Sequence, residues 1–140
     1  MNDLVDLKNN LFDGLSIAPQ SVSGTVNGTA VDCRQAGAEI VVHLAIGAVA
    51  SGATGTVTIE SSLNDNTDDA YAAADAYAQI NGSSEATSEY AITGSDANTL
   101  VVMKCILRDE KYVRVTAVTT DAVLLSAVVI SPPRVVGTIQ

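Results

Sequence analysis

The fold is decided by residues 99–130, which read TLVVMKCILRDEKYVRVTAVTTDAVLLSAVVI. Residues 99–107 are almost continuously apolar, which predicts a strand buried on both faces. Residues 111–119 alternate between apolar and polar side chains, as in a half-buried strand. After a turn at Thr120-Asp121, residues 122–130 form the last long strand in this interpretation. This stretch therefore predicts an antiparallel β structure.

Earlier stretches have the same period of two. Residues 39–46 predict a strand whose inner face carries Ile40, Val42, Leu44 and Ile46. His43 falls on the opposite, half-exposed face of that strand. Residues 56–63 alternate in the same way. Asn27-Gly28 is a strong signal for a two-residue hairpin, which predicts paired strands on either side of it.

Two segments depart from this period. The alanines of residues 70–79 favour a short helix. Residues 1–20 show a weak helical spacing interrupted by Asn, Gly and Pro, which indicates an arm that is either a short helix or an extended strap. The apolar side chains expected to anchor this arm in a groove are Leu4, Leu7, Leu11, Phe12, Leu15 and Ile17.

The predicted fold is mostly β. Seven or eight strands at regular spacing, with turn residues between them, are typical of an antiparallel β-sandwich or jelly roll. The expected organisation is an N-terminal arm over residues 1–20 followed by one β-sandwich domain over residues 21–140. A chain of 140 residues is long enough to bury a core without a metal or a disulfide.

Composition argues against two classes of partner. Charged residues make up only 16% of the chain and the net charge is −9, whereas nucleic-acid affinity comes largely from Lys and Arg. No apolar run is long enough for a transmembrane helix, and no secretory signal is visible at the N-terminus. We therefore expect no nucleic-acid or membrane partner, and free thiols at Cys33 and Cys105, although a bridge between them stays open.

The residues that could carry chemistry do not assemble into a motif. His43 is the only histidine, so an imidazole-based catalytic or metal site lacks a second ligand. Residues 65–69 resemble the start of a calcium loop, but Ala70 and Ala76 stand where glycine and glutamate are required. No nucleotide-binding or nucleophile-elbow motif is present. We expect no enzyme activity, no catalytic or metal-binding residues and no cofactor.

Five short segments carry a resemblance to a known group of proteins. They are residues 16–19 (SIAP), 23–32 (SGTVNGTAVD), 44–48 (LAIGA), 58–62 (TIESS) and 111–115 (KYVRV). In this order they resemble small β-rich virion proteins of tailed bacteriophages, of the head decoration or capsid cement type. The chain departs from that group at residues 70–78, where alanines stand in a region that often contains Trp.

The resemblance implies a structural protein that stabilises the phage head. It implies the major capsid protein as partner, a homo-oligomer such as a dimer or trimer, and a place on the head surface after synthesis in the host cytoplasm. Two alternatives remain open: another virion component, such as a tail, neck or head-fibre protein, and a carbohydrate- or surface-binding β module. The second alternative is disfavoured because the chain has five aromatic residues and no Trp.

Overall fold

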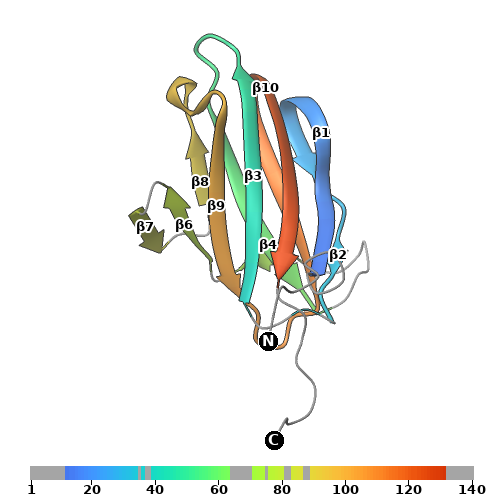
Figure 1. Cartoon of the computed structure of the whole chain (residues 1–140). Helices are drawn as coiled ribbons and strands as arrows, with labels where there is room; N and C mark the ends of the chain where they lie inside the picture. The colour runs from blue at the N-terminus through green and yellow to red at the C-terminus, as the bar shows by residue number, and fades with distance from the viewer. Residues whose placement is uncertain are drawn as a thin grey trace, which may run out of the picture.

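The chain folds into a curled antiparallel β-sheet (Figure 1). The structure is a computed structural model, and it describes residues 12–34, 36, 39–63, 71–74, 76–80, 83–86 and 89–131. Its strands are β1 (Phe12–Asn27), β2 (Val31–Asp32), β3 (Glu39–Val49), β4 (Gly55–Ser62), β5 (Ala72–Ala73), β6 (Ala76–Ile80), β7 (Ser83–Ala86), β8 (Glu89–Ile92), β9 (Thr99–Ile106) and β10 (Tyr112–Ser131). A short 3-10 helix, Gly94–Asp96, precedes β9. The mostly β, antiparallel class predicted from the sequence is confirmed.

The long strand β10 links the two halves of the sheet. Its first half pairs with β4, from Tyr112 opposite Ser62 to Thr119 opposite Gly55. Its second half pairs with β3, which continues to β9, β6 and β7. In Figure 1, β3 and β9 lie in front of β4, so the sheet folds back on itself. The predicted turn at Thr120-Asp121 is wrong, because β10 runs through these two residues as one continuous strand that passes between the halves.

The strand β1 follows β10 through this change of direction. It pairs with β10 from Phe12 opposite Ser131 to Asn27 opposite Thr116, with irregular register on the way. At the bend, the Thr119 hydroxyl donates a hydrogen bond of 2.9 Å to the Val22 carbonyl. β1 therefore closes one side of the curled sheet along its full length.

The core lies between the two halves of the sheet. The inward side chains of β3, β9 and β10 are fully or almost fully buried, including Leu44, Met103 and Val115. The predicted inner face of β3 is confirmed, because Ile40, Val42, Leu44 and Ile46 are all at most 3% exposed. β4 and β8 supply Val57, Ile59 and Ile92 from the other half. Burial of this alternating apolar set is the main favourable term in folding.

A buried serine within β1 connects this strand to the first half of β10 and to the chain that follows β1. Ser16 accepts a hydrogen bond of 2.9 Å at its hydroxyl from the Val115 amide and donates one of 3.0 Å to the Thr29 carbonyl. The Thr29 amide in turn donates to the Ser16 carbonyl. Gly28 must be glycine here, because a Cβ atom would lie 2.6 Å from the Val115 carbonyl oxygen.

Three further sequence predictions are wrong in local structure. The short helix expected over residues 70–79 is replaced by strands β5 and β6. The Asn27-Gly28 hairpin does not form, since β1 and β2 both pair with β10 instead of with each other. The strand over residues 99–107 is buried on one face only, because its burial alternates along β9.

The predicted boundary between arm and domain at residue 20 falls inside β1. Residues 12–20 belong to this strand, in which residues 12–15, 17 and 20 pair with β10, and the predicted anchor Ile17 is 1% exposed within the core. The anchors Leu4, Leu7 and Leu11 lie outside the described residues, as do residues 64–70 with the partial calcium loop. The role of residues 1–11 in assembly stays a prediction.

Candidate assembly surface

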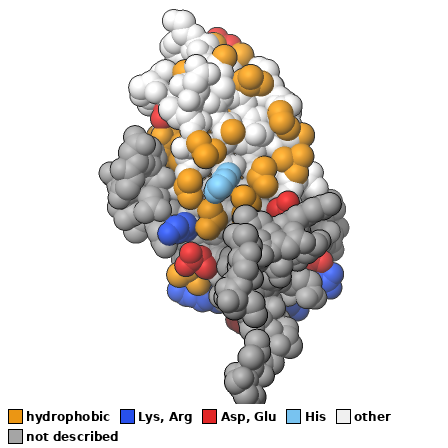
Figure 2. Space-filling model, in the orientation of Figure 1, with side chains coloured by type: hydrophobic (Ala, Val, Ile, Leu, Met, Phe, Trp, Pro, Cys, Tyr) orange, Lys and Arg blue, Asp and Glu red, His pale blue; other side chains and the backbone are white. Residues whose placement is uncertain are grey.

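The front of the molecule in Figure 1 carries an exposed apolar sheet face. We call it the outer face and define it by the outward side chains of β1, β10, β3 and β9. Its members are Leu15, Val41, His43, Ala45, Leu100, Val102, Leu124, Ser126, Val128 and Ile130. In Figure 2, hydrophobic side chains surround the pale blue His43 on this face.

The register of the strands places these side chains in rows. Leu15 pairs with Val128, Val128 pairs with His43, and His43 pairs with Val102. Ser126, Ala45 and Leu100 form a neighbouring row. Cross-strand neighbours on one face lie close enough to touch. The apolar side chains therefore form one continuous surface rather than scattered exposed residues.

Three leucines of this face are strongly exposed. Leu15, Leu100 and Leu124 expose 50%, 55% and 46% of their surface. Leu124 lies over Gly47, where a Cβ atom would come within 2.9 Å of its side chain. Gly47 thus lets Leu124 lie close to the sheet. Soluble monomers rarely expose apolar patches of more than a few hundred Å², so a larger patch marks an interaction site.

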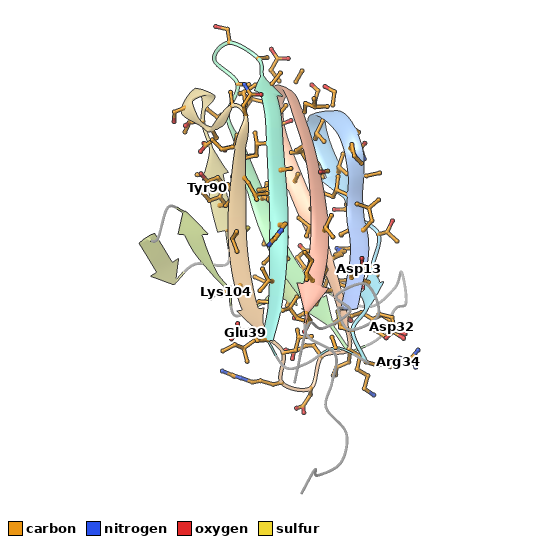
Figure 3. The ribbon with its side chains drawn as sticks, viewed as in Figure 1. Asp13, Asp32, Arg34, Glu39, Tyr90 and Lys104 are labelled. Atoms are coloured by element: carbon orange, nitrogen blue, oxygen red, sulfur yellow. The ribbon has the colours of Figure 1, made fainter. Side chains whose placement is uncertain are left out.

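Charged side chains lie at both sides of the outer face: Asp13 on β1 at one side, and Lys104 on β9 with the exposed Glu39 on the neighbouring β3 at the other. Asp13 pairs with Ile130, Ile130 with Val41, and Val41 with Lys104, so all four belong to a single row. Figure 3 shows Asp13 and Lys104 at opposite sides of the face and at similar height. Three strand spacings separate them, which is about 14 Å. Along this row, an acidic side chain on β1 is followed by two apolar side chains and then by a basic side chain on β9.

The opposite outer surface, on β4 and the first half of β10, carries polar and charged side chains that pair with one another. Its outward side chains include Tyr112, Arg114 and Thr116. Arg114 donates a hydrogen bond of 2.7 Å to Glu60, and its guanidinium lies 4.0 Å from the centre of the Tyr71 ring. Thr116 donates to the same carboxylate. Polar and charged groups are thus paired with one another on this side, while the outer face is left mainly apolar.

The residues considered for chemistry stay apart. His43 lies half-buried in the middle of the outer face, with Val128 and Val102 as its cross-strand neighbours. Among the described residues, no group of three or more His, Cys, Asp or Glu side chains is placed to hold a metal ion. Within the same ranges, no helix is long and apolar enough to cross a membrane.

Both cysteines are buried as free thiols, so the bridge left open by the sequence is not formed. Burial raises the pKa of the Cys33 thiol from 9.0 to about 12, and the negative charge of Asp32 contributes in the same direction. Cys105 is completely buried on the inner face of β9, as its apolar surroundings predict. Neither thiol is placed to act as an exposed nucleophile.

The outer face was not predicted as a site. The sequence contains Leu100 and Val102 of this face, but the continuous apolar run of residues 99–107 predicts a strand covered on both sides. A usable signal was the contrast within β10. Its first half places Tyr, Arg and Thr outward, whereas its second half places Leu124, Val128 and Ile130 outward.

Comparison with known proteins shows a similarity in fold only. The sequence matches no known protein-family profile, and no curated protein matches it. Among solved structures, the chain is similar to the crystal structure of the SPBc2 prophage-derived protein YomS, with a TM-score of 0.57 and 11% sequence identity. The match covers 93% of this chain and 100% of that chain. At this identity the likeness shows a shared fold.

Proposed function

We propose that this protein is a structural component of a phage particle, and specifically a decoration protein that stabilises the head shell. The observation that carries the proposal is the outer face, an exposed apolar sheet surface on a chain with net charge −9. Acidic charge keeps a free subunit soluble, while an apolar face gives it a surface to bury on assembly.

Two further observations support this role. The fold is shared with a prophage-derived protein, and five short sequence segments resemble virion proteins of the decoration type. We also propose that the two halves of the curled sheet, which β10 and β1 connect, are the two layers of the predicted β-sandwich. The expected partners are the major capsid protein and further copies of this chain. Repeated contacts over a shell would add avidity to a modest single interface.

The test is to locate the protein in purified particles. Particles from the phage that encodes it would be separated into heads and tails, and each fraction quantified by mass spectrometry. We expect the chain in the head fraction, at a fixed ratio to the major capsid protein. Recovery in tails alone would contradict the head role and favour the tail or neck alternative. Absence from all particle fractions would contradict the structural proposal itself.

A further inference from the structure

We propose that the outer face binds a second copy of this chain, giving a two-fold symmetric dimer packed face to face. The inference deepens the proposed function, since it names the partner of the same surface. The charge pattern and the size of the face support this dimer.

The charge pattern is self-complementary. In the row Asp13, Ile130, Val41, Lys104, the acid lies on β1 and the base on β9. The two-fold axis of this dimer runs parallel to the strands, between the two facing sheets and over the midline between β10 and β3. Rotation about this axis keeps each row at the same position along the strands and places β1 of one copy opposite β9 of the other. Asp13 then faces Lys104 of the partner subunit, and this pair occurs twice in the dimer.

The same operation matches the apolar rows. β10 of one copy lies on β3 of the other, and β1 lies on β9. Leu15 therefore faces the partner's Val102, and Ile130 faces the partner's Val41. Sheets that pack face to face keep their strands within about 30° of each other, which such an arrangement allows.

The size of the face is adequate for a specific dimer. Four strands about 4.8 Å apart, each contributing eight residues of about 3.3 Å, span about 500 Å² in plan on each copy. Two copies then bury about 1,000 Å², which is the lower limit for a specific interface. Because each copy carries a net charge of −9, association through a surface with few charges also minimises repulsion.

The first experiment reverses the two charges. Sedimentation velocity would be measured over a concentration series for the full chain, Asp13→Lys, Lys104→Asp and the double variant. We expect a micromolar dimer for the original chain, at least tenfold weaker association for each single reversal, and recovery to within about threefold in the double variant. Since Asp13 and Lys104 are about 14 Å apart within one chain, this recovery requires contact between subunits.

A second pair of variants tests the apolar centre. Val128→Glu places a charge in the outer face, whereas Val118→Glu makes the same change on the same strand at an outward position on the opposite surface. We expect the first to abolish dimerisation and the second to leave it unchanged. Thermal unfolding checks that both variants are folded.

Three results would overturn the dimer. The first is a full chain that is still monomeric at about 100 μM, well above the expected dissociation constant. The second is a double reversal that associates no more tightly than the single reversals. The third is a Val128→Glu variant that dimerises normally. The first would indicate that another occupant, such as residues 1–11 or the capsid, covers the face. These outcomes are separate from the location of the protein in heads, so either proposal can fail without the other.

Discussion

Ser16 joins β1 to the first half of β10 at a buried position. Its hydroxyl accepts a hydrogen bond from the Val115 amide and donates one to the Thr29 carbonyl, and Val115 is completely buried. Ser16→Ala leaves a buried amide without a partner, which costs about 1–3 kcal/mol. We expect a decrease of that size in the free energy of unfolding, measured by urea denaturation.

A matched control is available on the same strand. Ser23 is exposed, so Ser23→Ala is expected to change the free energy of unfolding by less than about 0.5 kcal/mol. Equal stability of the two variants would show that the Ser16 hydrogen bonds do not stabilise the fold. The sequence could not single out Ser16, because its two partners are 13 and 99 residues away.

Cys33 offers a chemical test of burial. The thiolate is the reactive form, and a pKa raised from 9.0 to about 12 decreases its population at neutral pH about a thousandfold. We expect alkylation of Cys33 by iodoacetamide near pH 8 to be at least about a hundredfold slower in the native protein than in denaturant. Mass spectrometry of the labelled peptide measures both rates, and rapid native labelling would contradict the buried thiol.

At the scale of elements, sequence reasoning worked where one face of a strand is clearly apolar. β3 alternates between inner aliphatic residues and an outer face with His43, so its orientation was predictable. β9 was misjudged because both of its faces are apolar although only one is buried. The pattern of side chains cannot distinguish a strand covered on both sides from one with an exposed apolar face.

Long-range pairing explains the other differences. Residues 76–80 have the alanine content of a helix, yet β6 pairs with both β9 and β7. Ladder hydrogen bonds with β9 override a helix preference worth only tenths of a kcal/mol per residue. At Asn27-Gly28, pairing of β1 and β2 with β10 takes precedence over the local turn preference.

Two truncations test the limits of β1. Removing residues 1–11 leaves β1 complete, and we expect a folded protein with cooperative thermal unfolding. Removing residues 1–20 also deletes Ser16 and the buried Ile17, and the combined loss of about 3–8 kcal/mol approaches the whole stability of a typical domain. We expect this shorter chain to be unfolded by circular dichroism. A stable fold after the longer deletion would show that residues 12–20 are dispensable.

The shorter truncation also tests the predicted arm. If Leu4, Leu7 and Leu11 anchor the protein to a neighbour, a folded chain without residues 1–11 should be incorporated into particles less efficiently. Normal incorporation would contradict the arm hypothesis and leave the outer face as the assembly contact.

For the molecule as a whole, the two outer surfaces differ in kind. One is dominated by polar groups, including the Arg114–Glu60 ion pair, while the other exposes Leu15, Leu100 and Leu124. The composition predicts an acidic, assembly-forming β protein, but not which surface is used. That information depends on the register that brings β1, β10, β3 and β9 side by side.

The proposed function in assembly depends on the outer face. The most direct measurement is the amount of the chain in phage heads produced with the original gene, with Val118→Glu or with Val128→Glu, quantified against the major capsid protein. We expect equal amounts for the original chain and Val118→Glu, and at least a tenfold loss for folded Val128→Glu. Normal incorporation of Val128→Glu would contradict this dependence.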